Sequence, residues 1–235
     1  MSLIRLDKLI ADSGVASRRE AKELVKQGKV RVDLSIASSA EMKIDPDMSK
    51  VYINGELLNY SEYRYIMMHK PNGVLSATED SSQETVIDLL PESLKKQELF
   101  PVGRLDKDTT GLLLLTNDGV FSHSIITPKR LVPKVYRAAV TGVLDENDVE
   151  AFEKGLTLSD GTKCMSARLE IEKPSVGLVT VYEGKYHQVK RMFASRGKHV
   201  TALHRLSIGS LSLDPALKPG QFKELTEEEK ELIFK

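Results

Sequence analysis

The residues best suited to chemistry lie in one short segment, residues 103–111. Its sequence, Gly-Arg-Leu-Asp-Lys-Asp-Thr-Thr-Gly, sets Asp106 between two cations and ahead of two hydroxyl groups. The glycines at both ends let the backbone turn tightly or approach a ligand closely. Flanking cations favour the ionised form of a carboxylate. The segment therefore predicts an activated carboxylate, Asp106, on a tight loop.

Two simpler interpretations compete for this segment. In the first, the polar groups only cap a turn, and the residues alone leave that interpretation open. In the second, the spacing of Asp106, Asp108 and Thr110 resembles a calcium loop. In that register the twelfth position is Asn117 instead of Glu, and residues 112–115 are all leucine. A calcium site is therefore excluded.

No other catalytic scheme assembles from the sequence. The G-x-S-x-G, Walker A, G-x-G-x-x-G and H-E-x-x-H patterns are absent. Cys164 is the single cysteine, which excludes an intrachain disulfide and a cysteine-based zinc site. We expect Cys164 to be a core residue in a protein of a reducing, cytoplasmic setting.

The composition limits the class of protein. The chain has 235 residues, 40% of them hydrophobic, which is enough for a core and predicts one large domain with a small one. No apolar run approaches the roughly 18 residues of a membrane span, and the N-terminus lacks the layout of a signal peptide. We expect no membrane association.

The net charge is zero, with 34 basic and 34 acidic residues, but the charges are unevenly distributed. Residues 1–31 carry four more basic than acidic side chains, and residues 32–62 carry four more acidic than basic ones. Segments 127–137 and 184–205 contain basic residues and no acid. Solvated helix faces explain any single cluster, whereas several clusters with aromatic residues among them favour a polyanion partner such as RNA or DNA.

The first 59 residues predict a compact unit. A helix ends near Asp12, and the capping box of Ser17 and Glu20 begins a second one over residues 18–27. Strands are predicted at 30–32 and 51–53, with a loop over 34–49 between them. The polar residues 59–62 are a candidate linker.

The remaining residues alternate between strands and helices. Residues 70–73 and 226–229 predict a turn and a capping box, respectively. Strands are predicted at 65–68, 112–115, 135–140 and 176–181, and helices at 85–90, 119–127, 189–195 and after 226. The residues alone thus indicate an α+β protein associated with nucleic acid, and they do not name a reaction.

A resemblance does name one. Residues 103–119, Gly-Arg-Leu-Asp through Thr-Asn-Asp-Gly, resemble the catalytic motif of pseudouridine synthases of the ribosomal small-subunit type. Lys-Pro-Asn-Gly at 70–73, Lys-Val-Tyr at 134–136 and Glu-Gly-Lys-Tyr-His-Gln-Val-Lys-Arg-Met at 183–192 resemble the family's first, tyrosine and basic motifs, in the family's order. Residues 5–32 are similar to an S4 RNA-binding domain. One departure is that Asp33-Leu34 follows the strand where S4 domains usually have Asn-Gly.

The resemblance implies the site residues. Asp106 would attack, or stabilise charge on, the sugar or the pyrimidine, and Lys190 would be the cation beside it. Tyr136 would stack on the target uracil and serve in proton transfer. The isomerisation is redox-neutral and uses no phosphate donor, so we expect no metal and no organic cofactor. The residues expected to contact RNA are Arg104, Lys70, Lys185, Gln188 and Arg191 in the larger domain, and Arg5, Lys8, Arg18, Arg19 and Lys22 in the smaller one.

The resemblance also implies an α+β fold with an S4-like domain over 1–59 and a catalytic domain over 60–235. The catalytic domain would have a mixed, mainly antiparallel sheet, surrounding helices and a central RNA-binding cleft. The basic motif looks most like that of the enzyme for 16S rRNA, so the expected target is uridine 516 in an assembling small subunit. We expect a monomer. The alternative is a non-catalytic S4-type RNA-binding or ribosome-assembly protein, whereas a metal-dependent nuclease lacks the clustered carboxylates and histidines it would need.

Overall fold

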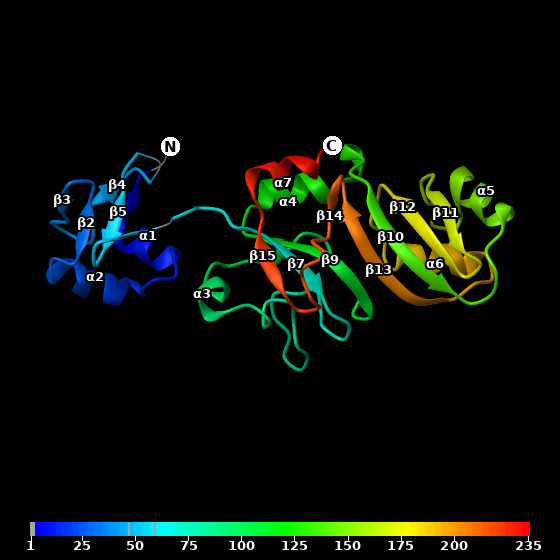
Figure 1. Cartoon of the computed structure of the whole chain (residues 1–235), viewed down its shortest axis with the longest axis horizontal. Helices are drawn as coiled ribbons and strands as arrows, with labels where there is room; N and C mark the ends of the chain where they lie inside the picture. Colours follow the sequence, from blue (N-terminus) through cyan, green and yellow to red (C-terminus); the bar gives the residue numbers. More distant parts are fainter. Residues whose placement is uncertain (1–2, 47, 59) are drawn as a thin grey trace. The chain divides into compact units, whose positions relative to one another are not determined.

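The computed structural model describes residues 3–46, 48–58 and 60–235, and they form two compact units (Figure 1). The first unit extends to Arg64 and includes Leu90–Leu99, and the second consists of Tyr65–Leu89 and Phe100–Lys235. The predicted linker begins at residue 59, which lies outside the described residues, and the domain boundaries of 1–59 and 60–235 stay a prediction.

The first unit packs two helices, α1 (Leu6–Asp12) and α2 (Arg18–Lys26), with short strands. Helix α2 begins at the predicted capping box, in which Ser17 Oγ accepts from the Glu20 amide and the Glu20 carboxylate accepts from the Ser17 amide. The sheet order is β3-β2-β5-β6, and β1 pairs with β4. The strands are β1 (Ile4–Arg5), β2 (Val30–Val32), β3 (Ser35–Ile36), β4 (Lys43–Ile44), β5 (Val51–Ile53) and β6 (Glu56–Leu57).

The prediction of a loop over residues 34–49 is wrong in part, because β3 and β4 lie within it. Val32 pairs with Ser35, so the β2–β3 turn has two residues. Asp33 adopts a left-handed φ of 54°, the conformation that the Asn of an Asn-Gly turn favours. Its carboxylate also accepts from the Lys50 amide at 2.8 Å. The departure from the S4 pattern therefore preserves the turn.

The second unit is built on a nine-stranded sheet with the order β11-β12-β10-β13-β9-β7-β15, to which β8 and β14 add at β9 and β13. The β9–β13 ladder is parallel, and the other ladders of this sheet are antiparallel. The prediction of a mixed, mainly antiparallel sheet is confirmed. The strands are β7 (Tyr65–Lys70), β8 (Phe100–Pro101), β9 (Thr109–Thr116), β10 (Lys134–Val140), β11 (Arg168–Lys173), β12 (Val176–Val181), β13 (Val200–Ile208), β14 (Leu211–Ser212) and β15 (Phe222–Glu224).

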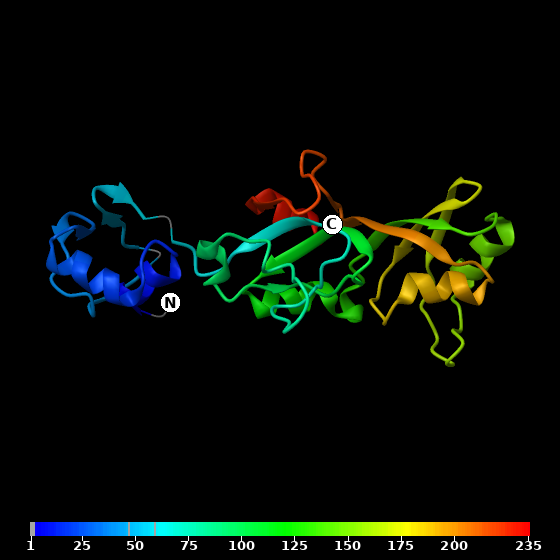
Figure 2. The same cartoon turned by 90° about the horizontal axis from the view of Figure 1, so that it is seen from below.

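Helices pack against this sheet and form two hydrophobic clusters with it. Near β10, β12 and β13, Phe152 of α5 and Phe193 of α6 pack with ring centroids 4.9 Å apart. Figure 2 shows α6 along one face of these strands. The second cluster joins β7 and β9 to α4 and the C-terminal segment. The helices outside α1 and α2 are α3 (Glu92–Lys95) in the first unit, and α4 (Gly119–Ile126), α5 (Glu146–Lys154), α6 (Gln188–Ser195) and α7 (Glu227–Leu232) in the second, where the 3-10 turn Pro128–Arg130 follows α4.

The predicted helix over residues 85–90 does not form. The Asp88 carboxylate accepts from the Thr85 amide and hydroxyl, both at 2.8 Å, and Thr85 forms a β-bridge with Leu75. Such local side-chain bonds compete with helical ones. Among the described residues, no helix combines the length and the apolar character that crossing a membrane requires.

Candidate functional site

Asp106 lies on the loop between β8 and β9, and its chain neighbours are fixed by segment 70–76. The Ser76 hydroxyl donates to the Leu105 carbonyl at 2.9 Å and accepts from the Leu105 amide at 3.1 Å. On the other side, the Gly73 amide donates to the Lys107 carbonyl at 2.9 Å. The backbone on both sides of Asp106 is therefore held before any ligand binds.

Lys70, at the end of β7, completes this clamp. Its fully buried ammonium donates to the carbonyls of Pro71, Lys107 and Thr109 at 3.0, 3.1 and 3.0 Å. Burial lowers the pKa of Lys70 to about 8. Because all three N–H groups are satisfied by carbonyls, this position is at odds with the RNA contact predicted for Lys70. The Lys70 side chain thus holds the backbone of the Asp106 loop at Lys107 and Thr109.

Two ladders of β13 bring the Asp106 loop close to Tyr136. Arg205 pairs in register with Gly111 of β9 on one side and with Tyr136 of β10 on the other. Gly111 has a φ of 107°, and a Cβ there would lie 2.3 Å from the Arg205 carbonyl oxygen. Only glycine permits this close approach, so the second glycine of the motif is required by the β9–β13 contact.

The Asp106 carboxylate contacts two side chains from the start of α6. Lys190 Nζ lies 2.9 Å from Oδ2, and His187 Nε2 lies 3.4 Å from Oδ1. Lys190 also pairs with the exposed Asp108 carboxylate at 2.5 Å. Burial acts to lower the pKa of Lys190, but hydrogen bonds to Asp108 and Asp106 and their charges outweigh it and raise that pKa. Lys190 therefore stays protonated and positively charged beside Asp106.

Tyr136 is held through its hydroxyl. Arg205 is only 4% exposed, and it donates to the Leu112 carbonyl at 2.7 Å and to the Tyr136 oxygen at 3.4 Å. Among the described residues, Arg205 Nη2 and Thr109 Oγ1 are buried and have no hydrogen-bond partner. Unsatisfied buried polar atoms are costly; Thr109 is one of the residues that line the pocket around Asp106, and Arg205 is not.

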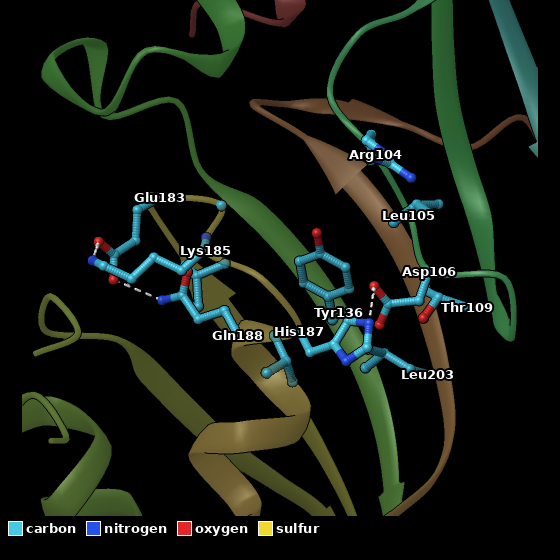
Figure 3. Close-up of a pocket in the computed structure, with 13 residues that line it drawn as sticks. Arg104, Leu105, Asp106, Thr109, Tyr136, Glu183, Lys185, His187, Gln188 and Leu203 are labelled. Atoms are coloured by element: carbon cyan, nitrogen blue, oxygen red, sulfur yellow. Dashed lines mark hydrogen bonds and ion pairs between the residues drawn. The ribbon is translucent and has the colours of Figure 1, made fainter. Parts of the chain in front are cut away.

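Asp106, Thr109, Tyr136 and His187 line one pocket (Figure 3), whereas Lys190 and Arg205 lie outside its lining. Asp106 and His187 point toward each other beside the Tyr136 ring at one end, and Leu105 and Leu203 add apolar surface. At the other end Glu183 is buried, accepts from Gln188 Nε2 at 2.7 Å and pairs with the Lys185 ammonium. A small planar molecule with polar edges would meet apolar walls, aromatic faces and one carboxylate here.

The residues predicted to contact RNA in this unit differ in their surroundings. Arg104 is exposed at the pocket and makes no ion pair or hydrogen bond with any described residue. Lys185 and Gln188 line the pocket and share Glu183. Arg191 pairs with Asp160 at 2.5 Å and lies outside the lining. Arg104 is therefore the predicted contact best placed to meet a phosphate.

Three residues of this region were not predicted as site residues. His187 lies in the basic motif next to Gln188 and three residues before Lys190, both predicted site residues. That position in the motif is the signal by which it could have been found. Thr109 lies in the Asp106 motif, but the sequence does not show which of the adjacent Thr109 and Thr110 faces the pocket. Arg205 is 69 residues from Tyr136 in the chain, a separation that no local pattern reveals.

The predicted cations of the first unit are partly engaged by acids. Arg5 pairs with Asp7 and Glu41, Lys8 with Asp12, and Lys22 with Glu41. Arg18 and Arg19, at the start of α2, are exposed and make no ion pair or hydrogen bond with a described residue. No group of three His, Cys, Asp or Glu side chains suited to a metal occurs in the part of the chain that the structure describes.

Known proteins resemble this chain along its whole length. The family model for RNA pseudouridylate synthase matches residues 64–195, and the S4 domain model matches residues 4–49. The chain is 48% identical to an uncharacterized RNA pseudouridine synthase, YtzG, of Bacillus subtilis, with 98% of each chain covered. It is 42% identical to ribosomal small subunit pseudouridine synthase A of Vibrio cholerae (99% of this chain, 100% of the relative) and 40% identical to that of Escherichia coli K12 (96% and 98%).

A solved structure supports the same assignment. A protein described as a pseudouridylate synthase superposes with a TM-score of 0.70 at 36% identity, covering 98% of this chain and 99% of the other. The motif resemblance, the S4-like first unit and the carboxylate pocket agree with these matches. The chain belongs to the RNA pseudouridine synthase family and carries an S4 RNA-binding domain.

Proposed function

We propose that this protein converts one uridine of 16S ribosomal RNA, uridine 516, to pseudouridine, with Asp106 as the catalytic carboxylate. The observation that carries the proposal is the Asp106 carboxylate, held 2.9 Å from Lys190 and facing the same pocket as Tyr136. Family membership favours this enzyme over a non-catalytic RNA-binding protein.

The reaction breaks the bond between uracil N1 and C1′ of the ribose and forms a bond from C5 of the same ring to C1′. The proton on C5 leaves and a proton returns to N1, so atoms and electrons balance without a redox partner. Asp106 attacks the sugar or the ring, or stabilises the charge that develops when the bond breaks. The pocket keeps the detached ring close enough to be reattached.

The other groups prepare Asp106 and the ring. Lys190 neutralises and orients the carboxylate, and Tyr136 supplies a face against which the uracil stacks. The Tyr136 hydroxyl, which accepts from Arg205, can pass a proton during the rearrangement. The hydroxyl of Thr109 offers a hydrogen bond to a polar edge of the ring.

A uridine inside folded RNA reaches such a pocket only if it is turned out of its stack, which costs a few kcal/mol. Stacking on Tyr136 and contacts of Arg104 with phosphate offset part of that cost. The S4 domain binds RNA elsewhere on the substrate and adds affinity. We propose that the substrate is an assembling small subunit in the cytoplasm and that the enzyme acts as a monomer.

The test is a pseudouridine map of ribosomal RNA from cells with and without this gene. The proposal expects one pseudouridine to disappear, at uridine 516 of 16S rRNA, and to return when the wild-type gene is restored. Restoring Asp106→Asn instead should leave the site as uridine. A missing pseudouridine at another position would keep the activity and change the target, and an unchanged map would refute the proposal.

A further inference from the structure

One exposed aromatic ring beside the pocket has no part in the chemistry described so far. Tyr186 is 75% exposed, more than any other aromatic side chain in the described ranges. Its inner face stacks on His187, with ring centroids 3.8 Å apart and an angle of 18° between the planes. The outer face is therefore available to another flat group.

The backbone that carries this ring is held by a polar contact. Arg191 donates to the Tyr186 carbonyl at 3.3 Å and is itself paired with Asp160 at 2.5 Å. His187, behind the ring, has a left-handed backbone with a φ of 47° and reaches Asp106 through Nε2. Stacking on His187 thus orients the Tyr186 ring before a ligand binds, and such preorganisation increases affinity.

The spacing of the two rings matches that of nucleic acid bases, which stack about 3.4 Å apart along a strand. Bases splayed out of an RNA stack on aromatic side chains, and each contributes substantially to binding. His187 also touches the carboxylate proposed to react with the target uridine. A base on the outer face of Tyr186 would be separated from Asp106 by the stacked rings of Tyr186 and His187, a gap that the next nucleotide of an unstacked strand can span.

We propose that Tyr186, backed by His187, is a stacking platform for the base of the nucleotide adjacent to the target uridine. The inference rests on the proposed function, because the target is the uridine at Asp106. The platform would favour RNA in which the neighbour as well as the target leaves its stack, and it would do so for any base, since every base has an aromatic face.

The experiment measures binding of the full-length protein to a fragment of 16S rRNA that contains the target. Three variants are compared in an Asp106→Asn background, so that the RNA stays unmodified: Tyr186→Ala, Tyr186→Phe and Tyr63→Ala. Tyr63 is another exposed tyrosine and provides the matched control. Each protein is titrated with intact RNA and with RNAs lacking the base on the 5′ or the 3′ side of the target.

On intact RNA, Tyr186→Ala should raise Kd about 5- to 150-fold, the range expected for loss of one base–aromatic stack. Tyr186→Phe keeps the ring and should stay within about twofold of its parent, as should Tyr63→Ala. On one of the two abasic RNAs the effect of Tyr186→Ala should disappear, because the partner of the ring is already missing.

An equal loss on all three RNAs would mean that Tyr186 acts through the fold, and it would overturn the platform, as would no loss at all. Pseudouridine formation by the wild-type protein on the intact RNA is measured in parallel. If that RNA is not modified while the coupling to the abasic site is present, the proposed target fails and the platform stands. If the RNA is modified and no coupling appears, the platform alone fails.

Discussion

At the scale of single residues, the arrangement around Lys190 explains how one cation can serve a carboxylate that changes charge. Lys190 pairs with both Asp106 and Asp108. If Asp106 forms a covalent bond during the reaction, its negative charge is lost and its ion pair weakens. Asp108 remains as a partner, so the half-buried ammonium is not left without a counter-charge. In the proposed cycle, the second carboxylate of the motif would keep a negative charge beside Lys190 throughout.

The first prediction concerns Asp106→Asn. The amide has the shape of the carboxylate but neither its charge nor its nucleophilicity, so the variant should fold, bind RNA and form no pseudouridine. Turnover is measured by the release of label from C5 of the target uridine under saturating RNA. Residual turnover above about a hundredth of wild type, about 2.7 kcal/mol in barrier, would deny Asp106 the central role.

The control is Asp108→Asn, which removes the other negative charge next to Lys190. Asp108 is 68% exposed and lies outside the pocket lining. Its loss should therefore reduce turnover far less than the loss of Asp106. Equal damage from both changes would mean that the total charge near Lys190 matters and that the identity of Asp106 does not.

The sequence predicted which residues lie near Asp106 better than it predicted the contacts of each one. Asp106 and Tyr136 line one pocket, and Lys190 pairs with the Asp106 carboxylate from outside that lining. Lys70 was taken for an RNA contact because its motif shows only a lysine at a turn. Two of the three carbonyl acceptors, those of Lys107 and Thr109, lie 37 and 39 residues away in the chain, and the turn contains no information about them.

At the scale of elements, β13 decides the geometry of the site, and it is one of the strands that the sequence did not predict. Its inward-facing Arg205 interrupts the apolar alternation by which a half-buried strand is recognised. Strands β10 and β12 keep that alternation and were predicted within one residue. Arg205, whose buried charge breaks the pattern by which the strand could have been predicted, is also the residue that donates to the Tyr136 hydroxyl.

The second prediction tests the clamp below the Asp106 loop. Lys70→Met fills a similar volume but leaves three carbonyls without their donor, which should lower the free energy of unfolding by about 3 kcal/mol. The saturated rate should fall at least tenfold, because the loop that carries Asp106 loosens, while the Kd for RNA changes little. Rates come from single-turnover assays and stability from urea unfolding.

Lys107→Met serves as the control, since Lys107 is exposed and its ammonium reaches only Gln83. It should reduce neither stability nor rate by a comparable amount. A normal saturated rate in Lys70→Met would show that the loop keeps its geometry without the clamp.

The third prediction concerns Asp148, in the capping box that begins α5. This carboxylate is fully buried and pairs with Lys198 at 2.8 Å and Arg196 at 3.2 Å. Burial acts to raise the pKa of Asp148, but the bonds from Lys198, the Asp145 amide and Arg196 outweigh it, so that the pKa lies below 3.8. The stabilisation is complete above pH 3.8 and is lost as the pH falls through the lowered pKa.

Asp148→Asn should therefore lower the free energy of unfolding at pH 7 by about 2 kcal/mol, and the difference from wild type should shrink as the pH falls below 3.8. Urea unfolding across this range measures it. Glu150→Gln, on the same helix, removes an exposed pair with Lys154 and should cost far less. A difference that persists at low pH would assign the loss to packing or capping.

At the scale of the whole molecule, many basic side chains are paired with acids, which limits how many of them are free to meet RNA. The basic stretch 184–205 suggested an open cationic groove, yet several of its cations are paired with acids from other segments, including Glu183, Asp160 and Asp148. The exposed cations without such partners include Arg104, Arg18 and Arg19. Only unpaired cations release counterions fully when they meet a phosphate, so RNA affinity should depend on few positions.

The last prediction tests this in the S4 domain with the variant Arg18/Arg19/Lys22→Ala. Each lost phosphate contact lowers the slope of log affinity against log salt by up to about 0.9. Lys22 shares Glu41 with Arg5, so its contribution is partly compensated in the free protein. The slope should therefore fall by about 1.8, the value for two full contacts, and the KM should rise while the saturated rate changes little, because these cations position RNA without taking part in chemistry.

RNA binding is titrated from low to high salt, with Lys154/Lys173/Lys235→Ala as a variant of equal charge change in the second unit. If the slope depended on net charge alone, both triple variants would shift it equally. If only the Arg18 variant shifts it, the S4 domain binds phosphate through these side chains. A fall in its saturated rate with binding unchanged would contradict this division of labour, because it would give the first unit a direct part in the reaction.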